Sequence, residues 1–369
     1  MYRKIMGFLE AWKESEHRKP LILQGARQVG KTYSILEFGR THYENVAYFN
    51  FETNPKLNET FDENISPDYL IPILSHIAGQ TIVKEKTLIV FDEVQLCERA
   101  LTSLKYFCEN APEYHIIALG SLLGVAVNRA RFSFPVGKVD MKTLYPMDME
   151  EFMLALGEET LVKEIKKSFD TDKPLPAALH ETAMQLYRQY LVVGGMPECV
   201  MQFAQTKDYI LVRHTQDTIL ASYLNDMSKY NNLNEIKKTR LAYDNITVQL
   251  SKKNTRFQYK LIKKGGRASE FENAIEWLCL SGIASQVYRV EQIKKPLENY
   301  RDIDAFKIYV SDLGLLCAKK DLAANDILYM VEELNDFKGG MTENYVNVQL
   351  AINGYNTYYW ESEHGAEID

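Results

Sequence analysis

The sequence lacks a long uncharged apolar run. The longest such stretch extends from Ile116 to Val127, is interrupted by Gly120, Ser121 and Gly124, and is much shorter than the roughly 20 residues needed to cross a bilayer. The N-terminus also lacks the apolar core of a signal peptide, because charged residues follow Met1 closely. We therefore expect no membrane span and a cytoplasmic protein.

Cysteine and histidine are scarce and form no metal-binding pattern. The 369 residues include 5 Cys and 7 His, without CxxC, HExxH or paired Cys/His spacing, which excludes a disulfide framework and a dedicated zinc site. Hydrophobic residues make up 46% and charged residues 25%, which excludes a disordered or fibrous chain. At roughly 150 residues per domain, the length predicts two or three domains.

The N-terminal part of the sequence predicts an α/β domain with a parallel sheet. Short continuous apolar runs alternate with helical patterns, which is typical of strands covered by helices on both faces. The expected strands are 21–23, 46–51, 88–91 and 115–119, and the expected helices are 31–40, 70–77 and 101–108.

The pattern becomes helical after Met149 and then mixed. Helical spacing over 150–156, 161–169 and 179–193 predicts a helical lid. Residues 234–306 suggest two helices, a basic helix or turn and a further helix, followed by two strands, the order of a winged-helix domain. We expect an α/β core domain at 1–155, a helical subdomain at 156–233, a winged-helix domain at 234–310 and a further, partial α/β domain at 311–369.

One motif carries a strong functional signal. Residues 25–32 read GARQVGKT, which matches G-x-x-x-x-G-K-[ST] between a predicted strand and a predicted helix, the context of a P-loop. Such a loop cradles phosphates with backbone N–H groups, its lysine reaches the β/γ-phosphates and its hydroxyl residue holds Mg²⁺. The predicted nucleotide-binding residues are Gly25, Ala26, Arg27, Gln28, Val29, Gly30, Lys31, Thr32 and Tyr33.

A second motif places two carboxylates at the end of a buried strand. Asp92 and Glu93 follow the run 88–91, at the edge where open α/β sheets bind ligands. We expect Asp92 to hold Mg²⁺ and Glu93 to orient or deprotonate the attacking water. The sequence leaves two roles equally open for Gln95, which are contact with the γ-phosphate and capping of a helix.

The next predicted strand ends in Gly120-Ser121. Ser121 would either sense the γ-phosphate or cap a helix N-terminus. Further along, Arg129 and Arg131 are candidates for an arginine finger that acts on a neighbouring subunit, or they are ordinary surface arginines. The first interpretation would require a homo-oligomer.

These motifs together resemble the prokaryotic AAA-type P-loop ATPases that carry a C-terminal DUF4143 domain. The resemblance rests on 24–32, 91–95, Gly120-Ser121, 134–138, 144–146, 151–152 and 194–198, and then on 306–315, 340–344, 358–360 and 367–369. It spans nearly the whole chain. It implies ATP as the nucleotide.

The resemblance also implies a restriction-endonuclease-like fold in the C-terminal part. Glu343 matches the helix carboxylate of that fold and Asp369 its strand carboxylate, whereas the Glu/Gln-x-Lys segment that would follow is absent. We therefore expect a truncated nuclease-like domain without nuclease activity in this chain. For a longer, whole protein, nuclease activity and a fold kept only for shape or binding are equal alternatives. Glu343 is equally interpreted as an ordinary carboxylate near a helix N-terminus, where the helix dipole favours it.

Local charge suggests a nucleic-acid partner although the net charge is −7. Basic residues cluster between 251 and 267 without an acidic residue, which in a helix-turn-helix would contact the phosphates of duplex DNA. The alternative is a solvated basic surface. The cluster consists of Lys252, Lys253, Arg256, Lys260, Lys263, Lys264 and Arg267.

The sequence thus predicts an enzyme, a Mg²⁺-dependent ATPase that associates with DNA. The alternative is a nucleotide-gated binding or regulatory module, in which ATP holds an ordered state and turnover is slow or absent.

Overall fold

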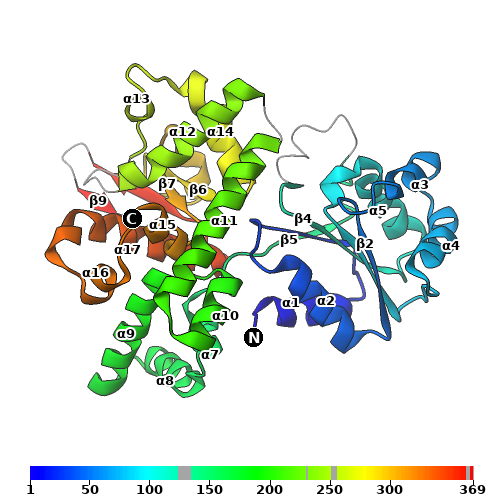
Figure 1. Ribbon diagram of the computed structural model, residues 1–369, viewed down its shortest axis with the longest axis horizontal. Coiled ribbons are helices and arrows are strands. Elements are labelled where there is room, and N and C mark those ends of the chain that lie inside the picture. The colour runs from blue at the N-terminus through cyan, green and yellow to red at the C-terminus, as the bar shows by residue number, and fades with distance from the viewer. Residues whose placement is uncertain (124–133, 230–231, 251–255, 363–365, 369) are drawn as a thin grey trace. The chain divides into compact units, whose positions relative to one another are not determined.

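The computed structural model describes residues 1–123, 134–229, 232–250, 256–362 and 366–368 (Figure 1). It contains two compact units, Arg3–Tyr145 and Pro146–Asp369, with Met1–Tyr2 counted in the second. Within the described residues, every helix is too short or too polar to span a bilayer. The finer domain boundaries expected from the sequence stay predictions.

The first unit is built on a five-stranded parallel sheet, which confirms the predicted α/β fold. The strand order is β2-β3-β4-β1-β5. The strands are β1 (Leu21–Gln24), β2 (Asn45–Asn50), β3 (Thr87–Asp92), β4 (His115–Gly120) and β5 (Asp140–Thr143). The helices are α1 (Ile5–Lys13), α2 (Lys31–His42), α3 (Leu57–Glu63), α4 (Pro67–Ala78) and α5 (Glu98–Asn110). Strand β5 was missed by the sequence analysis because its residues contain no apolar run.

The strand order creates a binding crevice beside β1. Strands β1 and β4 are neighbours in the middle of the sheet, but the chain leaves them in opposite directions. After β1 it continues to β2, at one edge of the sheet, and after β4 it continues to β5, at the other edge. Such a reversal of direction opens a crevice at the carboxyl ends of the strands, where open α/β sheets bind ligands. The loop at 25–32 follows β1 and therefore lies at this position.

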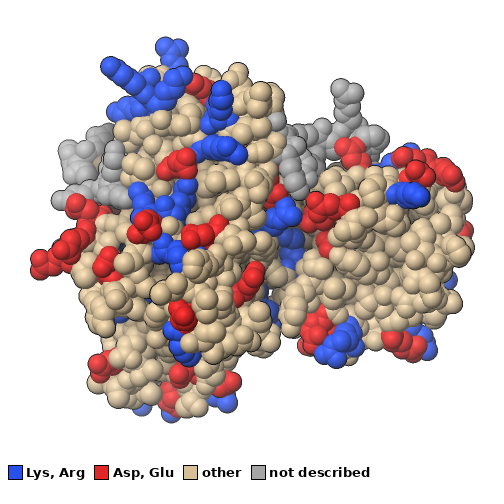
Figure 2. Space-filling model, in the orientation of Figure 1, with Lys and Arg blue, Asp and Glu red and all other residues tan. Residues whose placement is uncertain are grey.

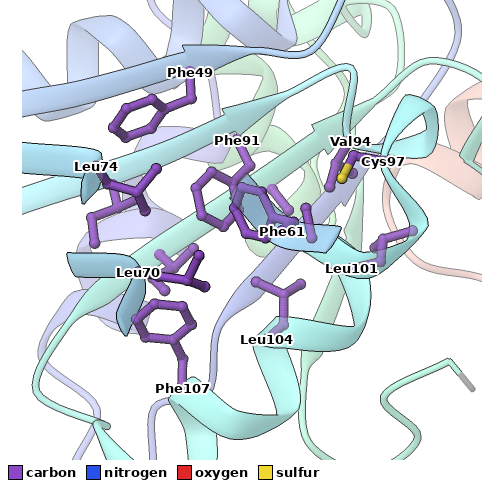
Figure 3. Packing of buried hydrophobic residues seen from close by; sticks show 14 of the residues in the cluster. Phe49, Phe61, Leu70, Leu74, Phe91, Val94, Cys97, Leu101, Leu104 and Phe107 are labelled. Carbon is purple, nitrogen blue, oxygen red and sulfur yellow. The ribbon is translucent and has the colours of Figure 1, made fainter. Parts of the chain in front are cut away.

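Helices α3, α4 and α5 cover one face of the sheet with an aromatic core. Figure 3 shows Phe91 of β3 among Leu70 and Leu74 of α4 and Phe107 of α5, and these side chains are at most 2% exposed. The rings of Phe61 and Phe91 pack edge to face, with centroids 5.6 Å apart. Because β3 and β4 are buried along their whole length, their polar functional residues emerge only at the strand ends.

The second unit begins with a helical part, as the sequence predicts. It comprises α7 (Met149–Ala155), α8 (Glu159–Asp170), α9 (Ala177–Val193), α10 (Pro197–Thr206) and α11 (Tyr209–Lys229). Helix α7 starts with a reciprocal capping box, in which Asp148 accepts from the backbone of Glu151 and Glu151 from the backbone of Asp148.

The turn after α9 is shaped by a buried carboxylate. Oδ2 of Asp312 accepts a hydrogen bond from the backbone N–H of Gly195 at 2.6 Å, and Oδ1 accepts from Leu315 at 2.8 Å. A Cβ on Gly194 would lie 2.3 Å from that Oδ1. Gly194 therefore does more than end helix α9. Because it has no side chain, the carboxylate of Asp312 can approach the backbone of this turn.

Three helices and an antiparallel strand pair follow, the winged-helix order. They are α12 (Leu233–Leu250), α13 (Tyr259–Ile262), α14 (Ala268–Leu280), β6 (Ala284–Val290) and β7 (Arg301–Val310). One long helix, α12, replaces the two that we expected, since the sequence from 233 to 250 contains no glycine or proline to break it.

The C-terminal strands join the same sheet as this strand pair. The helices are α15 (Leu313–Lys319), α16 (Ala324–Tyr329) and α17 (Asn335–Ile352), and the strands are β8 (Tyr358–Glu361) and β9 (Glu367–Ile368). The sheet order is β7-β6-β8-β9, with β8 parallel to β6. Strands that we expected in separate winged-helix and nuclease-like domains thus share one mixed sheet.

Candidate active site

The loop between β1 and α2 turns sharply, and two glycines allow the turn. Gly25 has a φ of +150° and Gly30 a φ of +90°, which residues with side chains rarely adopt. A Cβ on Gly25 would lie 2.1 Å from the carbonyl oxygen of Leu144. The loop is thus held against the segment after β5 and leads into the N-terminus of α2, where backbone N–H groups without helical partners attract anions.

Lys31 points back into this loop. Its side chain is 8% exposed, and its Nζ donates hydrogen bonds to the carbonyl oxygens of Gly25 and Ala26, each at 2.9 Å. The oxygens of a phosphate group would be stronger partners for the ammonium than these neutral carbonyls. The position of Lys31 therefore suits the predicted contact with phosphate.

Thr32 and Asp92 meet across the site. The Thr32 hydroxyl donates to Oδ2 of Asp92 at 3.0 Å, and the Tyr48 hydroxyl donates to the same oxygen at 2.6 Å. Burial raises the pKa of Tyr48 to about 12, and the hydrogen bond to Asp92 acts in the same direction, so the phenol stays protonated at neutral pH. Hydroxyl and carboxylate oxygens are ligands that Mg²⁺ accepts, so Thr32 and Asp92 fit the predicted metal site.

Glu93 lies beside this pair in an unusual backbone conformation. Its φ is +52°, and its N–H donates to Oδ1 of Asp92 at 2.9 Å. Its Oε2 accepts hydrogen bonds from Nε2 of Gln95 and, at 3.4 Å, from Oγ of Ser121. The two roles expected for Gln95 were contact with the γ-phosphate and helix capping. The contact in the structure is a different one, in which the Gln95 amide donates to the carboxylate that is predicted to activate water.

Two residues of the site were missed by the sequence analysis. Arg3 is buried and donates to the carbonyl oxygens of Val29 at 3.0 Å and Tyr145 at 2.8 Å, which ties the phosphate-binding loop to the end of the unit. Tyr48 contacts Asp92 from the neighbouring strand. No local signal identifies either one, because their partners are 26, 142 and 44 positions away in the sequence.

The remaining predicted loop residues differ in exposure. Ala26 and Val29 are buried, Arg27 is half-buried, Gln28 is exposed and Tyr33 is 64% exposed. Exposure at the first turn of α2 leaves Tyr33 available to a ligand. Arg129 and Arg131 lie outside the described residues, so the arginine-finger hypothesis stays a prediction.

The C-terminal residues predicted from the nuclease-like resemblance belong to the other unit. Glu343 accepts from the Tyr309 hydroxyl at 3.2 Å and pairs with the buried Lys307 at 3.4 Å. Asp369 lies outside the described residues. In the described part of the chain, no cluster of three or more His, Cys, Asp or Glu side chains is placed to hold a metal. The predicted nuclease-like role of Glu343 stays a prediction.

Fold and loop together define a P-loop nucleotide-binding domain of the AAA type. Residues 17–153 match the family described as an AAA domain, and residues 184–326 match a domain of unknown function, DUF8612. The predicted resemblance to DUF4143 is not shown by these matches and stays a prediction. No curated protein matches the chain.

Solved structures are similar to this chain at low sequence identity. The chain is similar to the Walker-type ATPase of Pyrococcus abyssi, with a TM-score of 0.52 and 13% identity over 86% of this chain and 95% of that one. The ORC2 protein of Aeropyrum pernix, solved in ADPNP–ADP complexes, gives a TM-score of 0.42 and 12% identity over 95% of each chain. The first similarity supports the fold assignment.

Proposed function

We propose that this chain binds ATP together with Mg²⁺ and hydrolyses it. The observation that carries the proposal is the convergence of Lys31, Thr32, Asp92 and Glu93 at the carboxyl ends of β1 and β3, with Thr32 and Asp92 joined by a hydrogen bond of 3.0 Å. A phosphate-binding loop, oxygen ligands for a cation and a carboxylate for the attacking water are the parts that phosphoryl transfer to water requires.

Each side chain has a distinct task in this mechanism. The loop N–H groups and Lys31 bind the phosphate oxygens, and Thr32 and Asp92 would hold Mg²⁺, which neutralises charge on those oxygens when bound. Glu93 accepts a proton from water as the water oxygen bonds to the γ-phosphorus and the bond from that phosphorus to the bridging oxygen of ADP breaks. The products are ADP and inorganic phosphate.

Two variants test the assignment. Lys31→Ala removes the phosphate contact, so we expect ATP binding to be lost. Glu93→Gln keeps the shape of the side chain and removes the base, so we expect ATP binding to persist while phosphate release falls by about 100- to 10,000-fold, the usual range for general acid–base catalysis. Binding is measured with a fluorescent ATP analogue and turnover by release of phosphate. Tight binding without turnover in the wild type would favour the nucleotide-gated module instead.

We further propose duplex DNA as a partner, because exposed cations gather around α13. Figure 2 shows Lys and Arg side chains grouped at the top of the view over this element. The exposed basic residues of the predicted cluster are Lys260, Lys263, Lys264 and Arg267. One of them, Lys263, also forms an ion pair with Glu270 at 2.9 Å. Lys252 and Lys253 lie outside the described residues, and Arg256 is partly buried.

The third helix of the winged-helix part limits how DNA would bind. Helix α14 carries Glu270, Glu272 and Glu276 and no lysine or arginine, so its insertion into a major groove would place carboxylates near phosphates. The basic residues precede this helix instead of lying on it. We therefore propose phosphate contacts from α13 and the loop after it, which confer affinity and not sequence preference.

A double charge reversal tests this surface. We expect Lys260→Glu with Lys264→Glu to abolish duplex binding measured by fluorescence anisotropy at low salt. Binding by the wild type should weaken steeply with salt, since counterions are released on binding. The matched control is Lys166→Glu with Lys173→Glu, two exposed lysines of the helical part. An equal effect of both double variants, or a flat salt response, would reject the site.

A further inference from the structure

The side chain of Gln95 is buried against the carboxylate that we assign to water activation. It belongs to a short 3-10 helix, Val94–Leu96, directly after β3, and is 8% exposed. Its Nε2 donates a hydrogen bond to Oε2 of Glu93, whereas its Oε1 is buried and has no hydrogen-bond partner in the described structure. Among the residues that the structure describes, Glu93 is therefore the one hydrogen-bonded neighbour of the Gln95 amide.

An unpaired amide oxygen in the interior is energetically unfavourable. Leaving a buried acceptor without a hydrogen bond destabilises the folded protein, and methionine would fill a similar volume without that cost. The amide of Gln95 donates a hydrogen bond to Glu93, and an apolar side chain cannot donate one. This contact gives a physical reason for a glutamine at this position.

Gly120 fixes the amide in place. A Cβ on Gly120, the last residue of β4, would lie 2.6 Å from Oε1 of Gln95 and 3.6 Å from its Cδ. Only a residue without a side chain leaves room for the amide here. Because the protein interior is close-packed, the two residues define one position for the amide group.

The hydrogen bonds leave one oxygen of Glu93 for the reaction. Gln95 and Ser121 both donate to Oε2, while Oε1 of Glu93 forms no hydrogen bond with another described residue. The backbone N–H of Glu93 is held by Asp92 at 2.9 Å. The carboxylate is thus fixed through Oε2 and through the backbone, which leaves Oε1 to receive a proton.

We propose that Gln95 is a positioning residue for ATP hydrolysis, which holds Glu93 so that its Oε1 meets the attacking water, and that Gly120 is required to seat it. The inference rests on the proposed function, in which Glu93 activates water. Its effect falls on turnover and not on nucleotide binding, because Gln95 contacts the base and not the phosphate-binding loop.

The first test replaces the amide by an apolar side chain of similar size. We expect Gln95→Met to lower kcat by about 10- to 100-fold, because small misplacements of a catalytic group cost up to about that factor. The dissociation constant for ATP should stay within about twofold of the wild type, as expected when only the transition state loses an interaction. A kcat equal to that of the wild type would overturn the inference.

The second test moves Gln95 without replacing it. Gly120→Ala should lower kcat in the wild-type background, because the added methyl group displaces the amide. Its effect should be clearly smaller in a Gln95→Ala background, where the tight contact that remains is the one of the added Cβ with Cβ of Leu123, at 3.1 Å. This non-additivity is the expected result of a contact between two residues. Gly7→Ala is the matched control, since a Cβ there meets nothing within 4 Å. Equal effects of Gly120→Ala in both backgrounds would contradict the proposed seating.

The outcomes separate this inference from the proposed function. If Glu93→Gln keeps wild-type turnover, the assignment of the base fails and the inference fails with it. If Glu93→Gln is inactive while Gln95→Met and Gly120→Ala are fully active, only the positioning role is wrong. Retained ATP binding by each variant shows that the variant is folded.

Discussion

The hydroxyl of Tyr48 donates a hydrogen bond of 2.6 Å to Oδ2 of Asp92, the oxygen that also accepts from Thr32. The side-chain amide of Asn50 in turn donates to the Tyr48 hydroxyl at 3.2 Å. Strand β2 thereby orients the carboxylate at the end of β3. In the proposed mechanism, a carboxylate oriented in this way would hold Mg²⁺.

Tyr48→Phe removes that hydrogen bond and keeps the ring. We expect the Mg²⁺ concentration for half-maximal ATP turnover to rise by about 10-fold, the lower limit usually seen when a partner of a metal-binding carboxylate is removed. Nucleotide binding without Mg²⁺ should not change. The control is Tyr106→Phe on α5. An unchanged Mg²⁺ requirement would show that Tyr48 does not orient Asp92.

Arg3→Met should destabilise the first unit and weaken nucleotide binding. The guanidinium donates to Val29 in the phosphate-binding loop and to Tyr145, and hydrogen bonds from a charged group contribute about 1.5–3 kcal/mol each. We expect a lower urea midpoint of unfolding and weaker ATP binding. Arg40→Met removes an exposed arginine of α2 that pairs with Glu37, and should have little effect on either quantity.

His115 gives the first unit a defined acid sensitivity. Burial lowers its pKa to about 4, and the nearby charges of Arg18 and Lys13 act in the same direction. Its Nδ1 shares a hydrogen bond of 2.7 Å with the Tyr43 hydroxyl. In the unfolded chain the imidazole takes up a proton at about pH 6.5, whereas in the folded chain it stays neutral until the pH approaches 4. The contribution of His115 to stability is therefore complete above pH 6.5 and is lost as the pH falls toward 4.

We therefore expect the wild type to lose more stability than His115→Gln between pH 7.5 and pH 5. Urea midpoints measured at both pH values give the comparison, and the other histidines are the same in both proteins. Equal losses would show that His115 is protonated in the folded protein.

Asp312→Asn should destabilise the second unit. Each carboxylate oxygen accepts a backbone N–H, from Gly195 on one side and Leu315 on the other, whereas an amide can accept only through its oxygen. One buried N–H would lose its partner at a cost of about 1–3 kcal/mol. Urea unfolding measures the change, and Asp321→Asn, at a fully exposed carboxylate, is the control. No loss of stability would mean that the turn after α9 does not depend on the charge.

The parallel sheet and its loop could be predicted from the sequence because their signals are local. Apolar runs define β1, β2, β3 and β4, and the loop motif identifies itself through spacing alone. Strand β5 contains Met141 between polar residues, with an exposed side chain, so its identity as a strand comes from pairing with β1 and not from its own sequence.

The contacts around the carboxylates could not be predicted in the same way. Tyr48 and Arg3 reach the site through the arrangement of the strands, and a single sequence carries no record of that arrangement. Gln95 was considered because it follows Glu93 closely, yet its partner depends on the space left by Gly120, which lies 25 positions further along. Register and packing, which are non-local, decide these contacts.

Steady-state ATP hydrolysis by the wild type and by Glu93→Gln, on preparations whose ATP binding has been measured, tests the central claim most directly. Our account predicts Mg²⁺-dependent phosphate release by the wild type and its near-complete loss in the variant, with ATP bound equally by both. Equal turnover by the two proteins, or tight binding with no turnover by the wild type, would contradict it.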